Sequence, residues 1–507
     1  MKRNHYFAVI MSILVIVIVI LPSFNVFAEE VAIGKYGVEV AEISTFIQDQ
    51  MEIGKIPGIS VVVVEGENIV YQKSFGYADL KSENKVDQET LFELASNSKA
   101  FTGLGILKMI DDGLINMNSN VKEYLPWLTL YYDDSEVDVT VEQLLHHTSG
   151  ISSKTISMIQ ISNNDNALEN TVKTLVDTNL DTYPGDDFQY ATINYDVLGL
   201  IIQEVSGVSY EEYILKEILV PLGLSNTYLF NNDDTENKLA TGYKIGFLRP
   251  IPYKAPIYRG NKPAGYIMSN ISDIGKWLKL QIGTGDVKVF DNLIAQSHIP
   301  DQNVTSPYDD SSYAIGWTVK DREGLEIIHG GNNPNYSSYM VIRPEEEFAV
   351  AVLSNINSSY TSVIGHGIKE KLLNNDYIYM GRDNYEFIDK IGVVVILIGS
   401  IISLLMLILI VRRILRIVHK KSSIKKLTKR CAIKMIILFV FVCGISYFLN
   451  TIPSIFFGAS WGFVFVWYPF SIRIALYLVY MAIWSIYLFI TIGCLSEKNL
   501  QVVKNDE

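Results

Sequence analysis

Apolar residues gather in long runs at both ends of this chain. At the N-terminus, Lys2 and Arg3 precede an apolar run from Tyr6 to Leu21, and Val26-Phe27-Ala28 places small residues before a cleavage point. This layout is typical of a secretory signal peptide, which we expect over residues 1–28. An uncleaved signal anchor is the alternative, and with either one the segment that follows is exported.

The C-terminal third holds three further apolar runs, at residues 391–411, 435–451 and 474–495. A helix rises ~1.5 Å per residue and the bilayer core is ~30 Å thick, so each run is predicted to form a transmembrane helix. Residues 381–390 would then be a linker between the first of these helices and the preceding domain.

Charge predicts how these helices are oriented. Residues 412–434 carry ten Lys or Arg and no acidic residue, which predicts a cytoplasmic loop by the positive-inside rule. The tail at 496–507 is then cytoplasmic too, and the domain before the helices lies outside. We therefore expect a multi-pass protein of the cell membrane, with the domain of residues 29–380 extracytoplasmic.

Residues 452–473 are apolar and rich in aromatic side chains, among them Trp461 and Trp467. The segment is too short between its prolines for a fourth span, so we expect an interfacial or re-entrant outer loop. Two interpretations remain open. The segment is a plain aromatic belt, or it is a lipid-facing floor beneath an active site that holds an acyl chain.

Between residues 29 and 380 the pattern changes to the short periods of a globular domain. Strands near both ends of this segment with helices between them predict an α/β domain, in which an antiparallel sheet is flanked by helices and joined by a helical subdomain. The predicted helices are 40–53, one opened by Ser96, 140–147, 197–205, 272–280 and 361–373, and the predicted strands are 59–64, 69–76, 325–329, 336–342 and 348–353.

Composition narrows the functions that this domain could have. The net charge of −13 gives no reason to expect a nucleic-acid partner. The three cysteines, Cys431, Cys443 and Cys494, all lie in the C-terminal third, so the globular domain has no disulfide and no cysteine metal site. We expect no metal and no cofactor.

The candidate chemistry starts at Ser96-Asn97-Ser98-Lys99. Residues three apart on a helix share one face, so the Ser96 hydroxyl and the Lys99 amine would stand together. A basic amine beside a serine can activate it as a nucleophile without a histidine. This spacing alone occurs by chance in many proteins, where the serine caps a helix and the lysine is solvated.

Two later motifs make chance unlikely. A Tyr-x-Thr motif begins at Tyr190, and His329-Gly330-Gly331 lies on a predicted strand. With the Ser-x-x-Lys motif they make residues 40–373 resemble the serine β-lactamase and penicillin-binding protein superfamily, on the class C and D-alanyl-D-alanine carboxypeptidase side. The recurring family segments 147–150, 221–224 and 263–265 also match.

The resemblance implies roles for these residues. Ser96 would attack a carbonyl, Lys99 would accept its proton, and Tyr190 would relay a proton to the leaving group. The oxyanion hole would use the backbone N–H of Ser96 and of a residue near Asn332 or Asn333. Gly330 and Gly331 would let substrate lie along the strand as an added strand. His146 and His147 are expected to be structural.

Two departures from the family pattern concern substrate binding. Thr192 stands where many relatives have asparagine, and it offers a hydroxyl instead of a carboxamide. His329 stands where many have lysine, and a neutral imidazole is a weaker anchor for a carboxylate. His329 could also be an ordinary strand residue.

A signal peptide, an outer hydrolase domain and three C-terminal spans together resemble the prodrug-activating peptidases of colibactin and zwittermicin maturation. That resemblance implies removal of an N-acyl-D-asparagine cap, with Glu93, Thr192 and Asn332 as candidates for binding the carboxamide. The expected partners are a small peptide-like or acylated substrate and membrane lipid, and a homodimer stays open. The alternatives are a D-alanyl-D-alanine carboxypeptidase, an esterase or a β-lactamase on the same scaffold, and a non-catalytic sensor.

Overall fold

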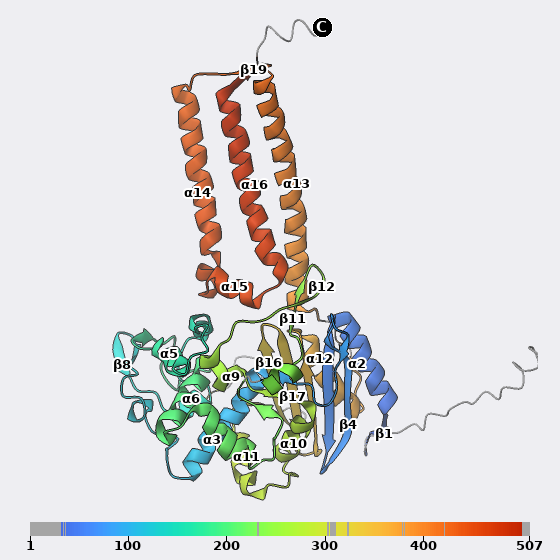
Figure 1. The fold of residues 1–507 in the computed structure, drawn as a ribbon. Coiled ribbons are helices and arrows are strands. Elements are labelled where there is room, and N and C mark those ends of the chain that lie inside the picture. The colour runs from blue at the N-terminus through green and yellow to red at the C-terminus, as the bar shows by residue number, and fades with distance from the viewer. Residues whose placement is uncertain are drawn as a thin grey trace, which may run out of the picture.

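The computed structural model describes residues 32–498, apart from residues 34, 36, 231–232, 302–303, 305–310, 322–323, 378, 380 and 420. The predicted signal peptide and most of the predicted tail lie outside these residues. The chain forms a catalytic domain and, beyond it, a bundle of three long helices (Figure 1).

The catalytic domain is built on one antiparallel sheet, as the pattern of strands predicted. Within the described residues its strand order is β14-β15-β16-β17-β18-β3-β4-β5. Strands from both ends of the domain therefore meet at the β18–β3 pair. The strands are β14 (Ser312–Tyr313), β15 (Thr318–Asp321), β16 (Leu325–Asn333), β17 (Tyr336–Arg343), β18 (Phe348–Ser354), β3 (Gly58–Glu65), β4 (Asn68–Asp79) and β5 (Asn84–Lys85).

Both faces of this sheet are apolar, because side chains alternate along each strand. Val61 and Val63 of β3 enter a core with α2 (Val40–Gly54) and α12 (Tyr360–Leu372). Val62 and Val64 enter the larger core on the opposite face. The run of valines that predicted a strand is thus explained by burial on both sides.

The larger core is shared with the helical subdomain. Its centre is α3 (Ser98–Asp111), whose residues are nearly all buried, packed against α6 (Ile193–Ser206). The other helices here are α4 (Val141–Leu145), α5 (Ala167–Lys173), α7 (Tyr210–Tyr213), α9 (Lys262–Gly265), α10 (Ile271–Gln281) and α11 (Asp291–Ser297). The predicted combination of sheet and helical subdomain is confirmed.

Three helices are long and apolar enough to cross a membrane: α13 (Asn384–Val418), α14 (Lys429–Phe457) and α16 (Phe470–Leu495). Each is longer than the predicted span. α14 continues to Phe457 and α16 starts at Phe470, so both ends of the predicted outer loop 452–473 are helical. The linker predicted at 381–390 is helical from Asn384 onward, so that prediction is wrong for most of its length. The Asp383 side chain caps α13 by accepting a hydrogen bond from Glu386 N.

The two connections of the bundle lie at opposite ends (Figure 1). The basic segment lies far from the catalytic domain, where β19 (Ser422–Ile424) pairs with β20 (Ser496–Lys498). The aromatic segment lies against the catalytic domain and contains a short helix, α15 (Trp461–Trp467). The basic loop and the catalytic domain are thus at opposite ends of the helices.

Candidate active site

Ser96 lies in a strained turn just before the central helix. Ala95–Asn97 form a 3-10 helix and α3 begins at Ser98, so the α-helix starts two residues later than predicted. Ala95 has φ 49°, a left-handed conformation that costs a residue with a Cβ about 1–2 kcal/mol. The turn is held by Leu94, whose N–H donates to Ile267 O (2.8 Å) and whose carbonyl accepts from Ser338 Oγ (2.5 Å).

Lys99 lies directly beneath Ser96 and is fully buried. Its Nζ donates to Ser96 Oγ at 3.1 Å and to Ala264 O at 2.8 Å. No carboxylate of the described residues lies within ion-pair distance of this amine. The geometry therefore places a basic amine against the serine hydroxyl, as the Ser-x-x-Lys spacing predicted, and suits transfer of the serine proton to Lys99.

Tyr190 completes the cluster from the loop before α6. The centre of its ring is 5.1 Å from Lys99 Nζ. The His147 ring packs beside it, with 4.4 Å between ring centres. A phenol at this position can pass a proton between Lys99 and a leaving group.

His147 supports Tyr190 as a neutral ring. Its Nδ1 accepts from Asn194 Nδ2 (3.0 Å) and from Ala191 N (3.4 Å), so its proton is on Nε2, which is buried and has no partner among the described residues. Burial, aided by the Lys99 charge, holds the pKa of His147 well below its usual value. The position fits the structural role predicted for it.

His329 lies on β16, with its ring centre 6.2 Å from that of Tyr190. Its Nδ1 can only donate to Gly330 O (2.8 Å), so its Nε2 accepts from the Tyr313 hydroxyl (3.0 Å). Burial, and then the charge of Lys99, lowers the pKa of His329 to about 3. His329 therefore faces the site as a neutral imidazole.

The two glycines after His329 have different reasons to be glycine. β15 starts at Thr318, opposite Ile328, so among the described strands residues 329–333 pair only with β17. A Cβ on Gly330 would meet only Tyr339, at 4.0 Å. A Cβ on Gly331 would overlap Ser338 Oγ and Leu94 O. Gly330 thus keeps the strand edge open, whereas close packing of β16 against the Ser96 turn requires glycine at 331.

Glu93 is set back from the cavity. Its Oε2 accepts from Asn333 Nδ2 (2.6 Å), and the same nitrogen donates to Gly265 O (2.8 Å). Burial raises the pKa of Glu93 to about 7, and the bond from Asn333 opposes this rise. The structure thus places Asn333, not Glu93, at the cavity wall, and Glu93 can act on a substrate only through Asn333.

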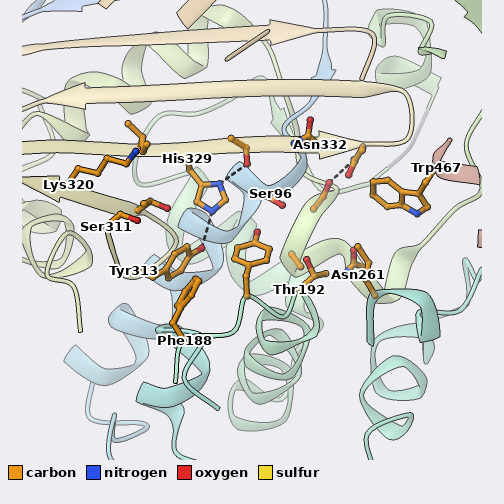
Figure 2. Close-up of a pocket in the computed structure, with 18 residues that line it drawn as sticks. Ser96, Phe188, Thr192, Asn261, Ser311, Tyr313, Lys320, His329, Asn332 and Trp467 are labelled. Atoms are coloured by element: carbon orange, nitrogen blue, oxygen red, sulfur yellow. Dashed lines mark hydrogen bonds between the residues drawn. The ribbon is translucent and has the colours of Figure 1, made fainter. Parts of the chain in front are cut away.

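A cavity of about 540 Å³ joins these groups (Figure 2). Of the predicted site residues, Ser96, Tyr190, Thr192, His329, Gly330 and Asn332 line it, whereas Lys99, Glu93 and Gly331 lie behind its wall. In Figure 2, His329, Tyr313 and Lys320 lie on one side of Ser96, and Thr192, Asn261 and Trp467 lie on the other.

Apart from Asn333, which the resemblance offered as a possible oxyanion-hole residue, the remaining lining residues were not predicted from the sequence as site residues. They come from loops and strands distant in the chain, and they are Ile156, Phe188, Asn261, Ala264, Gly265, Ser311, Tyr313, Thr318, Lys320, Ile328, Asn333 and Trp467. The aromatic composition of residues 452–473 was a signal for Trp467, since one interpretation of that segment placed it beneath the site.

A family model described as Beta-lactamase matches residues 43–373. The chain belongs to the beta-lactamase family. This beta-lactamase family member is 30% identical over 446 residues to Protein flp of Staphylococcus aureus (strain MRSA252), and the match covers 88% of each chain. It is 26% identical over 320 residues to Penicillin-binding protein 4* of Bacillus subtilis (strain 168), covering 58% of this chain and 67% of that one.

Solved structures agree with the family. The octameric penicillin-binding protein homologue from Pyrococcus abyssi matches with a TM-score of 0.60 and 29% identity, over 66% of this chain and 78% of that one. EstCE1, a hydrolase with promiscuous acyltransferase activity, matches with a TM-score of 0.56 and 20% identity, over 66% of this chain and 97% of that one. The second match shows a shared fold. The resemblance to the superfamily of serine hydrolases that the three motifs predicted is confirmed.

Proposed function

We propose that this protein is a membrane-anchored serine amidase that acts outside the cytoplasmic membrane and removes an N-acyl-D-asparagine cap from a natural-product precursor. The observation that carries the proposal is the lining of the cavity. The cavity is lined by three asparagines, Asn261, Asn332 and Asn333. Its described lining includes no carboxylate, and Lys320 is its one lysine or arginine. Such a wall suits a neutral, amide-rich substrate.

Catalysis would proceed through an acyl-enzyme. Ser96 Oγ attacks the amide carbonyl while Lys99 takes the hydroxyl proton, and the Ser96 N–H and a β16 N–H near Asn332 stabilise the oxyanion. Collapse of the tetrahedral intermediate breaks the C–N bond, and the proton passes from Lys99 through Tyr190 to the leaving amine. Water then attacks the ester with Lys99 as base, releasing the acid and restoring Ser96.

The hydrogen bonds of Asn333 support recognition of an amide. Both N–H groups of its carboxamide are used, one by Glu93 Oε2 at 2.6 Å and one by Gly265 O at 2.8 Å. Its carbonyl oxygen is therefore the group left to accept an N–H from a substrate. The carboxamide of a D-asparagine residue supplies such a donor.

The neutral state of His329 argues against a substrate that carries its carboxylate at this place, as carboxypeptidase and β-lactam substrates do. A neutral imidazole whose two nitrogens are already bonded to Gly330 and Tyr313 offers an anion little. One observation favours the carboxypeptidase alternative, because Lys320 lines the same end of the cavity as His329 (Figure 2). The alternative is therefore kept as an outcome of the assay.

The test is a substrate panel on the full-length protein in detergent. N-acyl-D-Asn amides, their L-Asn and D-Asp counterparts, D-Ala-D-Ala peptides, simple esters and a chromogenic cephalosporin would be compared, with Ser96→Ala as control. We expect turnover of the D-Asn amides, at least tenfold above the D-Asp analogues, and none with Ser96→Ala. Turnover confined to D-Ala-D-Ala peptides or cephalosporin would overturn the substrate assignment.

The orientation in the membrane has its own test, because the described catalytic domain has no cysteine. In intact cells, a membrane-impermeant maleimide should label an added cysteine at the exposed Lys276→Cys position and should leave Cys431, near the basic loop, unlabelled. Labelling of Cys431 alone would place the catalytic domain inside.

A further inference from the structure

The membrane helices contribute a side chain to the active-site cavity. Trp467 is the last residue of α15, which connects α14 to α16 and lies against the catalytic domain (Figure 1). Its indole lines the cavity that contains Ser96, on the side where Thr192 and Asn332 lie (Figure 2). A catalytic domain cut before α13 would lack this wall.

The catalytic domain holds the C-terminal end of α15 through one lysine. Lys244, on β11 (Tyr243–Gly246), donates from Nζ to Phe465 O at 3.0 Å and to Val466 O at 2.8 Å. These are carbonyls of the last turn, which has no partners within its own helix. Lys244 thus fixes the backbone immediately before Trp467.

Keeping Lys244 in this place is costly. It is 3% exposed and no carboxylate of the described residues lies within ion-pair distance of it. Burial, with the charge of Arg473 adding to it, lowers the pKa of Lys244 to about 7. An apolar residue would pack here more cheaply, so the two bonds to α15, together with the Tyr253 ring 4.4 Å from Nζ, account for a lysine.

Two further contacts secure the same junction. The turn that joins β11 to β12 (Arg249–Pro252) has Phe247 and Leu248 in left-handed conformations, with φ of 52° and 64°. Their N–H groups donate to the Asp389 carboxylate of α13 at 3.1 and 2.6 Å. At the C-terminal end of α14, Gly458 O accepts from Ser157 Oγ at 2.9 Å.

The surroundings of Trp467 indicate what it would contact. A narrow seam of about 10 Å³ lies between the domain and α15 and shares Ile156, Asn261 and Trp467 with the cavity. Its other lining residues are Ile159, Tyr258, Tyr266 and Phe463. Apart from Asn261 and the two tyrosine hydroxyls, this lining is apolar. The leaving group is expected on the side of the cavity where Tyr190 and His329 lie. The acyl part of the substrate would then lie on the opposite side, next to Trp467.

We propose that Trp467 is a specificity-determining residue that selects an apolar substituent on the acyl part of the substrate, and that Lys244 is a positioning residue that acts through it. This proposal rests on one part of the proposed function, hydrolysis through Ser96. It does not depend on a D-asparagine residue in the substrate. The membrane bundle is then part of the active site as well as an anchor.

The test compares a small and an apolar acyl group on one leaving group. The ratio of kcat/KM for p-nitrophenyl octanoate to that for the acetate would be measured for wild type, Trp467→Ala, Lys244→Met and the double variant, all full length in detergent. Lys244→Met keeps the side-chain length and removes the donors. Trp484→Ala, on α16 and outside the cavity, is the matched control.

We expect Trp467→Ala to lower this ratio about tenfold through KM, as loss of an apolar contact should. Lys244→Met should lower it in the same direction, and the double variant should fall no further than Trp467→Ala. An unchanged ratio in Trp467→Ala, or additive losses, would overturn the proposal. If wild type turns over neither ester, protection of Ser96 from a fluorophosphonate by octanoyl and acetyl amides gives the same ratio.

These outcomes separate the two proposals. Ester selectivity that depends on Trp467 without any turnover of D-Asn amides would refute the proposed function and leave the role of Trp467 standing. If D-Asn amides with acetyl and octanoyl caps are turned over equally in every variant, the role of Trp467 is refuted and the proposed function stands.

Discussion

A single methyl group added at Gly331 should damage both stability and catalysis. An alanine Cβ there would overlap Leu94 O and Ser338 Oγ and lie 3.0 Å from Ala95 Cβ. Leu94 O is backbone and already accepts a hydrogen bond, so it cannot move alone. Either β16 or the turn that carries Ser96 must shift.

The size of the effect follows from these contacts. Overpacking of a well-packed site typically costs about 1–3 kcal/mol, so we expect a loss near 2 kcal/mol and a fall in Tm of a few degrees. A displacement of Ser96 by about 1 Å would slow its reaction about 100-fold. Because Gly331 has no positive φ, steric overlap alone produces these effects.

Gly330→Ala is the matched control. Its Cβ would meet only Tyr339, at 4.0 Å, so the variant should keep the wild-type Tm even if substrate binding along the strand edge suffers. Both variants would be purified full length in detergent and followed by thermal unfolding and by the rate at which a fluorophosphonate labels Ser96. Wild-type Tm and labelling in Gly331→Ala would refute the reasoning about this contact.

Three other changes test separate parts of the account. Because the pKa of Glu93 is raised to about 7, its contribution to stability is present at low pH and is lost as pH rises through 7. Between pH 5 and 8 the free energy of unfolding of Glu93→Gln should therefore rise by up to about 3 kcal/mol relative to that of wild type. Parallel curves of Tm against pH for the two proteins would contradict this. Because the pKa of His329 is held at about 3, His329→Gln should keep the wild-type shape of the pH–rate profile between pH 5 and 8, whatever its rate, and a lost acid limb would show that His329 titrates there. Asp389→Ala should cost about 2–4 kcal/mol by freeing the N–H groups of Phe247 and Leu248, whereas Asp389→Asn should cost less, and equal Tm values for the two would contradict the role of that carboxylate.

The sequence was sufficient for features that depend on local pattern. The β-branched run at 59–64 and the alternating residues at 69–76 predicted two neighbouring strands, and β3 pairs with β4. The spacing of Ser96 and Lys99 predicted their contact, because a helical turn brings i and i+3 together whatever surrounds it. The three apolar runs predicted the three long helices for the same reason.

Features imposed by tertiary contacts were not predictable in this way. Alanine has no preference for a left-handed conformation, so the strained Ala95 turn depends on β16 and β17 packing behind it. The resemblance implied that Glu93 lies near the substrate, but Asn333 stands in front of it, which only the contact between β6 (Phe92–Glu93) and β16 reveals. Trp467 reaches the cavity only because the helical bundle docks on the domain.

The central claim is that Ser96 carries a transient acyl group during turnover. The most direct measurement is the mass of the full-length protein, and of its peptides, after rapid mixing with an N-acyl-D-Asn amide and acid quench. The account predicts an adduct equal to the acyl mass on the peptide that contains Ser96, slower formation of this adduct in Tyr190→Phe, which lacks the proton relay to the leaving amine, and none in Ser96→Ala. An adduct on another residue, or hydrolysis that survives in Ser96→Ala, would contradict it.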